Sequence, residues 1–164
     1  MKFKLKELNF NNISLNKTIL ENGTIINLKY SNELLEFQTP RITINNLIKE
    51  KDKEYLVLKI IGNQACKTFC SKINELETYF SESLKKPIKT IFNEDLFTVK
   101  IPFRSSNPLI KVYKDNSLFN YYHLSKDMEI ICLLGVDKIW INNYNEPSYH
   151  LIVKEIMVMW FKDT

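Results

Sequence analysis

Short runs of alternating apolar and polar residues follow one another along most of the chain. Such alternation, rich in β-branched and aromatic residues, is typical of strands with one buried face. It predicts strands at residues 2–6, 24–31, 34–38, 41–44, 55–61, 88–92, 96–103, 109–114, 128–134, 138–142 and 149–159. Short strands with turn residues between them are the pattern of a small barrel or sandwich.

One segment has a different period. Between Gln64 and Lys86 the apolar residues recur every three or four positions, which places them in one stripe on a helix. The stripe consists of Cys66, Phe69, Cys70, Ile73, Leu76, Phe80 and Leu84. Asn63 is suited to cap the start of this helix, and Pro87 is suited to end it. The pattern therefore predicts one amphipathic helix at about residues 64–86.

The order of these elements sets the expected fold class. Many strands, one central helix and further strands fit a small Greek-key barrel that is OB-fold-like and has extra strands. We expect the whole chain, residues 1–164, to form a single β-rich domain. The alternative is an open β-sandwich covered by one helix.

The stretch Gln38-Thr39-Pro40-Arg41 separates two alternating runs. Proline lacks a backbone donor and restricts the residue before it, so this stretch is predicted to break one strand from the next. Arg41 is one of two arginines among many lysines, and its planar guanidinium suits bidentate phosphate binding. It is the functional candidate of this segment.

Composition narrows the class of protein. Hydrophobic residues make up 45% of the chain and aromatic residues 12%, which is ordinary for a folded globular protein. The net charge is +4, with the surplus of basic residues in the first 120 positions. Three cysteines and no signal-peptide pattern predict an intracellular protein that is not secreted. No apolar run is long enough to cross a bilayer, so no membrane is expected.

Catalytic and metal-binding patterns are absent from the sequence. With three glycines in total, no glycine-rich phosphate loop can form. Cys66, Cys70, His123 and His150 have the side chains of zinc ligands, but both cysteines lie in the apolar stripe of the helix. They are expected to be buried thiols. We therefore predict no enzyme, no cofactor and no metal site.

Basic and aromatic residues alternate on several predicted strands, as in proteins that bind single strands by phosphate contacts and base stacking. In residues 96–104, alternation puts Phe97, Val99 and Ile101 on one face and Lys100 on the other. For each aromatic residue, packing in the core is the competing interpretation. The candidates for nucleic-acid binding are Lys29, Tyr30, Phe37, Arg41, Lys100, Arg104, Lys111, Tyr113 and Lys114.

Two segments resemble a group of proteins from nucleocytoplasmic large DNA viruses. The first is "LLEFQTPRI", which resembles that group's L-x-F-Q-T-P segment, and the second is residues 124–158, which contain "KIWIN" and a final alternating strand. The group is similar to single-stranded DNA-binding proteins with OB-like folds. The resemblance adds Trp140 to the binding candidates and again points to Phe37 and Arg41.

The first hypothesis is a sequence-nonspecific single-stranded DNA-binding protein of viral DNA replication, repair or recombination. Its place would be the host cytoplasm or a viral replication factory. Single-stranded DNA is the expected partner rather than RNA, and a homo-oligomer is left open. The alternative is a β-rich structural or interaction protein of the virion or replication factory, without enzymatic activity. Its long final strand would pair with a partner's edge.

Overall fold

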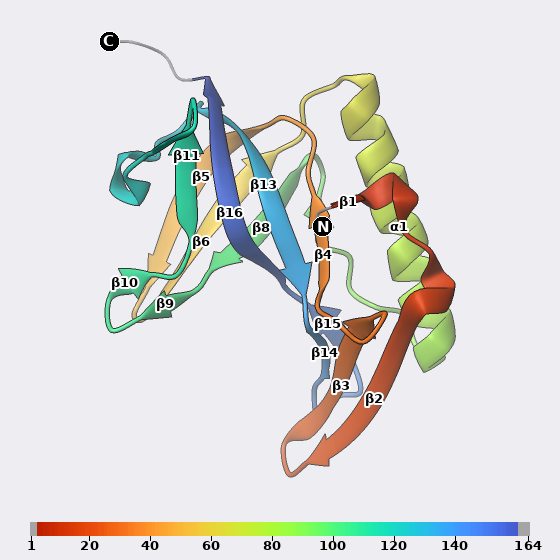
Figure 1. The fold of residues 1–164 in the computed structure, drawn as a ribbon. Coiled ribbons are helices and arrows are strands. Elements are labelled where there is room, and N and C mark those ends of the chain that lie inside the picture. Colours follow the sequence, from red (N-terminus) through yellow and green to blue (C-terminus); the bar gives the residue numbers. More distant parts are fainter. Residues whose placement is uncertain (1–2, 161–164) are drawn as a thin grey trace.

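The computed structural model describes residues 3–160, and it consists of strands around one long helix (Figure 1). The strands are β1 Phe3–Lys4, β2 Ile13–Leu20, β3 Gly23–Tyr30, β4 Leu35–Gln38, β5 Ile42–Glu50, β6 Lys53–Lys59, β7 Phe92–Asn93, β8 Leu96–Ile101, β9 Phe103–Arg104, β10 Asn107–Pro108, β11 Lys111–Lys114, β12 Ser117–Leu118, β13 Glu129–Val136, β14 Lys138–Ile141, β15 Pro147–Tyr149 and β16 Leu151–Trp160. The helices are α1 Gln64–Leu84 and the short 3-10 helices Leu5–Glu7, Phe10–Asn12 and Tyr121–His123.

Five strands close into a barrel. Strand β13 pairs with β5, β5 with β6, β6 with β8 and β8 with β16, and β16 pairs back with β13. Only the pairing of β8 with β16 is parallel among these five. Further strands extend the sheet at β13 and β16. The fold is therefore mainly β with one helix, an OB-like barrel with extra strands, as the sequence predicts. The open sandwich is wrong because β13 and β16 close the barrel.

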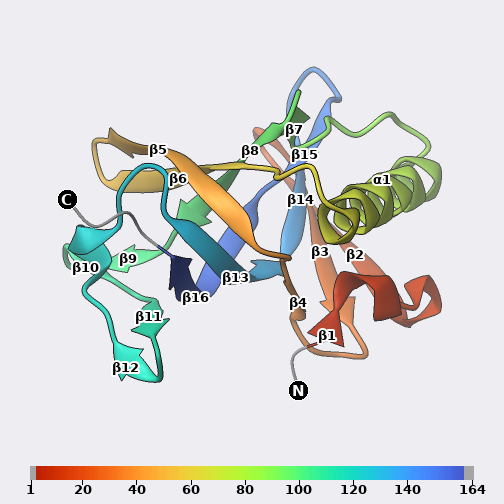
Figure 2. The same cartoon turned by 90° about the horizontal axis from the view of Figure 1, so that it is seen from above.

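Helix α1 covers one side of the barrel (Figures 1 and 2). The predicted residue caps its N-terminus, because Asn63 Oδ1 accepts a hydrogen bond of 2.8 Å from the backbone N–H of Cys66. The predicted stripe faces the core, where Phe69 packs between Phe37 and Phe97 at ring distances of 6.3 and 5.9 Å. Among residues 3–160, no helix combines the length and apolar character needed to span a membrane.

A second, smaller sheet projects below the barrel in the order β15-β14-β3-β2 (Figure 1). Strand β13 runs on into β14, and β15 runs on into β16, so the barrel and this sheet share one long bent hairpin. Strand β2 is not among the strands that the sequence predicts. Its residues after Ile13 are almost all exposed, so the strand has no alternating buried pattern to reveal it.

The break predicted at residues 38–41 is a corner between β4 and β5, which both pair with β13. Strand β4 pairs with β13 up to Gln38, and β5 pairs with the same strand from Ile42 onwards. Thr39 holds the corner, because its N–H donates to the carbonyl of Cys132 and its Oγ1 accepts from the N–H of Cys132. The Thr39 hydroxyl thus takes the place of a backbone carbonyl as acceptor for the N–H of Cys132, while Pro40, which has no N–H, ends the ladder of β4.

Candidate nucleic-acid interface

The outer face of β6, β8 and β16 carries lysines beside an aromatic ring. In the register of these strands, Tyr55 lies opposite Lys100, and Lys100 lies opposite Ile152. Their chain neighbours Leu56, Val99 and Leu151 are buried in the barrel, so these three side chains point outwards. We call this surface the barrel face; it consists of Lys53, Tyr55, Lys100, His150, Ile152 and Lys154.

The charge of the barrel face is predominantly positive. Within residues 3–160, none of Lys53, Lys100 and Lys154 forms an ion pair with a carboxylate. Burial lowers the pKa of His150, and the charges of Lys100 and Lys53 lower this pKa further. The charge of Lys138 also lowers the pKa of His150, whereas the carboxylate of Asp137 raises it. The histidine therefore senses several cations that come from different strands.

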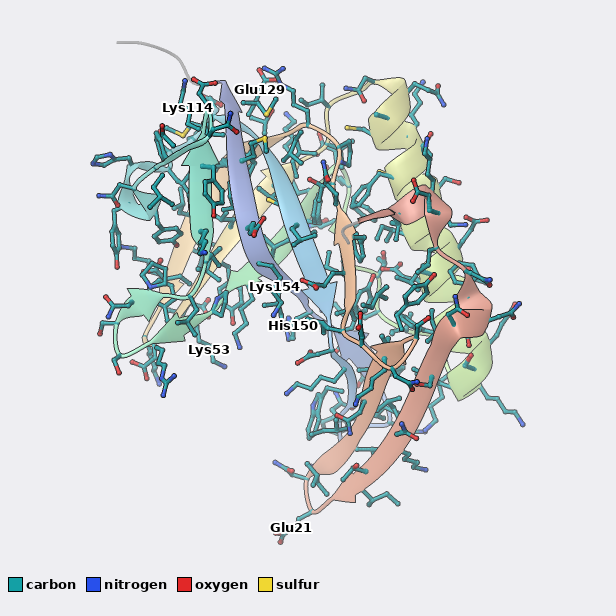
Figure 3. The ribbon with its side chains drawn as sticks, in the orientation of Figure 1. Glu21, Lys53, Lys114, Glu129, His150 and Lys154 are labelled. Carbon is teal, nitrogen blue, oxygen red and sulfur yellow. The ribbon has the colours of Figure 1, made fainter. Side chains whose placement is uncertain are left out.

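Figure 3 shows Lys53, His150 and Lys154 towards the lower end of the barrel, away from helix α1. They come from the start of β6, the residue before β16 and the middle of β16. In barrels of the OB type, the face of the second and third strands binds oligonucleotides. Here the second and third barrel strands along the chain are β6 and β8, so the barrel face occupies that position.

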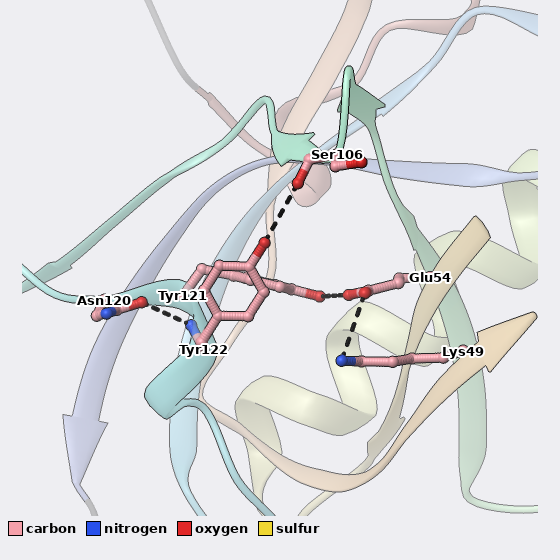
Figure 4. A network of polar contacts seen from close by, with 6 residues as sticks. All are labelled: Lys49, Glu54, Ser106, Asn120, Tyr121 and Tyr122. Atoms are coloured by element: carbon pink, nitrogen blue, oxygen red, sulfur yellow. Dashed lines mark hydrogen bonds and ion pairs between the residues drawn. The ribbon is translucent and has the colours of Figure 1, made fainter. Parts of the chain in front are cut away.

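A polar network fixes β6 from its inner side (Figure 4). The carboxylate of Glu54 accepts a hydrogen bond of 2.5 Å from the hydroxyl of Tyr121 and lies 3.7 Å from Lys49 Nζ. Burial and the adjacent Glu54 raise the pKa of Tyr121 well above its usual range, so its hydroxyl stays protonated as a donor. The network engages the carboxylate of Glu54 on the inner side, and the neighbouring Tyr55 lies on the outer face.

The predicted candidates do not come together in one site. Lys100 lies in the barrel face, and Lys29 and Trp140 lie on the outer side of the small sheet. Arg104 is exposed on β9, which forms a separate two-stranded ribbon with β10. The structure therefore divides the candidates among several surfaces.

Three further candidates lie on β11. Lys111 and Tyr113 share the outward side of the strand, as alternation predicts, while Val112 is buried. Lys111 lies opposite Glu155 in the register with β16, and Lys114 Nζ lies 3.1 Å from Asp115. We call Lys111, Tyr113 and Lys114 the β11 face. Its basic side chains have carboxylates beside them.

The remaining candidates are engaged within the fold. Phe37 is fully buried and packs against α1, so it is a core residue and cannot stack on a base, which corrects that expectation. The hydroxyl of Tyr30 accepts a hydrogen bond of 3.0 Å from the N–H of Asn9. Arg41 Nε lies 2.7 Å from Glu129, and this ion pair competes with a phosphate for its guanidinium. Arg41 as a phosphate ligand stays a prediction.

Most residues of the barrel face are not among the candidates that the sequence predicts. Tyr55 lies in, and Lys53 just before, a segment whose pattern predicts a strand and gives no sign of a binding site. The alternation of His150, Ile152 and Lys154 could have indicated that these three residues share one face of the last strand. Alternation identifies a shared face on one strand only. It does not reveal that β6, β8 and β16 are neighbours.

The structure brings together no cluster that suits a metal ion. Across residues 3–160, no three His, Cys, Asp or Glu side chains are grouped as metal ligands would be. Cys66, Cys70 and Cys132 are unbridged, and burial raises the pKa of Cys132 to about 12. A thiol in that environment stays protonated and is a poor metal ligand.

Comparison with known proteins identifies a fold and no family. No protein-family model matches the chain, and no curated protein matches its sequence. These searches give no support to the resemblance to proteins of large DNA viruses. Among solved structures, the fold is similar to gp2.5, a single-stranded DNA-binding protein encoded by bacteriophage T7. The TM-score is 0.52 and the identity 12%, over 80% of this chain and 91% of that one.

Proposed function

We propose that this protein binds single-stranded DNA across the barrel face. The observation that carries the proposal is the pairing of Tyr55 with Lys100 on the second and third barrel strands. Lys53 and Lys154 flank this pair, and no ion pair within the described chain engages any of the three lysines. The fold supports the proposal, because the similar phage protein is named for single-stranded DNA binding.

Two kinds of contact would hold the strand. The lysines neutralise phosphates and release their counterions, so the affinity falls steeply as the salt concentration rises. The ring of Tyr55 offers a face on which a base stacks, a contact that each of the four bases can make. Neither contact reads base edges, and binding with little sequence preference follows.

The proposed role is to cover exposed single strands during DNA replication, repair or recombination. The protein would act by binding rather than by catalysis. DNA is the proposed ligand rather than RNA, and the proposed setting is intracellular. A viral replication factory is the finer proposal, which rests on the resemblance of two short segments to viral proteins.

A titration with a fluorescently labelled oligo-dT tests the proposal. We expect binding at about 50 mM salt and a linear fall of log affinity against log salt concentration, with a slope of about −0.7 per phosphate contact. An oligo-rU of the same length tests the preference for DNA. No binding of oligo-dT at low salt, or an affinity that ignores salt, would contradict the proposal.

A structural or interaction protein is the second candidate, and the free edge of β2 favours it. The final strand β16 does not serve this purpose as predicted, because it is paired with β13, β8 and β11. Within residues 3–160, β2 is instead one of the two edge strands of the small sheet, and Ile19 near its tip is 74% exposed. Light scattering separates the candidates: a stable oligomer that does not bind oligo-dT favours the second.

A further inference from the structure

The small sheet has a polar outer face of its own. Along β3, Ile26 and Leu28 are buried against the core, whereas Asn27 and Lys29 are exposed on the opposite side. The register places Asn16, Asn27 and Lys138 in one row across β2, β3 and β14. We call Asn16, Asn27, Lys29, Lys138 and Trp140 the hairpin face.

An indole ring lies at the lower end of this face. Trp140 is half-buried on β14, in the outward row that also contains Ile25 of β3. A Cβ atom on Gly23 would come within 2.6 Å of both Cζ2 and Cη2 of Trp140. The six-membered ring of Trp140 therefore occupies the space that a side chain at position 23 would need. A ring held against a strand in this way is a preformed platform for base stacking.

The hairpin face is continuous with the barrel face. The side chain of Lys154, in the barrel face, passes over Gly135. Its Cε would lie 3.2 Å from a Cβ atom built on that glycine, and Leu34 Cδ2 would lie 3.3 Å from the same atom. Leu34 in turn lines a shallow hollow with Asn16, Asn27, Lys29, Asp137 and Lys138.

The charge of the hairpin face suits a polyanion. Neither Lys29 nor Lys138 forms an ion pair with any carboxylate of residues 3–160. Asp137 is the acidic member of the hollow, beside the two lysines. The asparagine side chains can donate hydrogen bonds to phosphate or base oxygens.

We propose that the hairpin face binds a further stretch of the single strand that crosses the barrel face. Trp140 stacks on a base, and Lys29 and Lys138 contact phosphates. This inference rests on the proposed function. It implies that the protein covers more nucleotides than the five-strand barrel alone, for which about 4–16 nucleotides is the usual range.

A series of oligo-dT lengths tests the extension, with Lys29→Ala as the variant and Lys17→Ala as its matched control. Both lysines are exposed on the same hairpin, but Lys17 lies opposite Ile26 in the register and therefore points to the other side of the sheet. With long oligonucleotides we expect Lys29→Ala to weaken binding about threefold and to reduce the salt slope by about 0.7. With the shortest oligonucleotides that still bind, Lys29→Ala is expected to match the wild type.

Tryptophan fluorescence gives an independent readout. The chain has two tryptophans, Trp140 and Trp160. We expect long oligo-dT to quench the fluorescence of the Trp160→Phe variant, in which Trp140 is the remaining emitter. Short oligo-dT bound to the barrel face is expected to leave that fluorescence largely unchanged.

The outcomes separate the two proposals. If Lys29→Ala and Lys17→Ala bind long oligo-dT equally, and the Trp160→Phe variant is not quenched, the extension is wrong while binding to the barrel face stands. If the wild type binds no oligo-dT of any length, the proposed function itself fails, and the extension fails with it.

Discussion

The barrel face and the β11 face have the same kinds of residues but different electrostatic surroundings. Each has a tyrosine with a lysine on the same outward side of the sheet, and Lys114 of the β11 face follows on the side of Val112. On the barrel face the lysines form no ion pair within residues 3–160. On the β11 face, Lys114 is paired with Asp115, and Lys111 has Glu155 as its register neighbour. Under the proposed function, the ion pair of Lys114 with the adjacent Asp115 is the difference that makes the β11 face the poorer surface for a polyanion.

Reversing charge on the two faces is expected to give the largest difference between them. The double variant Lys100→Glu/Lys154→Glu removes two phosphate contacts and adds two repulsive charges. We expect it to lose about 100-fold or more in affinity for oligo-dT near 50 mM salt. The matched double variant Lys111→Glu/Lys114→Glu is expected to lose less than about fivefold. Equal losses, measured by fluorescence anisotropy on variants with unchanged thermal midpoints, would show that net charge alone drives binding.

Removing one aromatic ring from each face is expected to give the next largest difference between them. Tyr55→Ala is expected to cost about 1–3 kcal/mol of binding free energy, because a base loses its stacking partner. Tyr55→Phe keeps the ring and is expected to retain most of the affinity. Tyr113→Ala on the β11 face is the control, and we expect it to change the affinity for oligo-dT less than twofold. A loss at Tyr113 that equals the loss at Tyr55 would remove the distinction between the two faces.

The pH dependence of binding is expected to come from the barrel face. In the free protein, burial and the neighbouring lysines hold the pKa of His150 below its ordinary value of 6.5. Bound phosphates favour the imidazolium and raise that pKa, so binding takes up a proton and strengthens as pH falls. We expect the wild type to bind oligo-dT about threefold to tenfold more tightly at about pH 5.5 than at about pH 7.5. The part of this change that is absent from the His150→Gln variant is assigned to His150. An identical pH profile in the variant would exclude His150 as the cause.

The same depressed pKa has an opposite effect on the stability of the free protein. Because the unfolded chain binds the proton more readily, His150 contributes stability above its unfolded pKa, and this contribution is lost as pH falls. Binding and stability are therefore expected to change in opposite directions over this range. Thermal unfolding with and without oligo-dT measures both.

The ion pair of Arg41 offers the smallest expected effect. Glu129→Gln removes the carboxylate that occupies Arg41 Nε, and Arg41→Ala removes the guanidinium itself. We expect Glu129→Gln to tighten binding by less than about threefold, and Arg41→Ala to weaken it by a similarly small factor, because the pair is exposed and worth little. A tenfold loss in Arg41→Ala without a change in thermal midpoint would make Arg41 a principal ligand of the strand.

Much of the fold follows from local patterns in the sequence. The period of the apolar residues gives helix α1 and its cap, and alternation gives most of the barrel strands. The predicted strand at residues 88–92 is wrong, since only its last residue, Phe92, lies in a strand. Two other local failures have physical causes. Strand β2 is exposed on nearly all positions, and β5 extends past a bulge between Ile44 and Asn46 that interrupts its alternation.

The candidate site is less accessible from sequence because it depends on pairing over long distances. Tyr55 and Lys100 are 45 positions apart, and the barrel register makes them neighbours. Phe37 illustrates the reverse case. Its place near Arg41 in the sequence suggested a site, but Phe37 is buried against α1, and Arg41, beyond the corner at Thr39 and Pro40, pairs with Glu129. The pairing of acidic side chains with lysines likewise depends on which distant segments the closed fold brings together.

If a single strand of DNA crosses the outer face of β6, β8 and β16 as proposed, amide chemical-shift mapping by NMR locates it there. On adding oligo-dT to the labelled protein, we expect the largest shifts around Tyr55, Lys100 and Ile152, with residues of β11 and β12 nearly unchanged. Shifts that concentrate on β11 and β12, or saturable binding that leaves the barrel face unperturbed, would contradict the account.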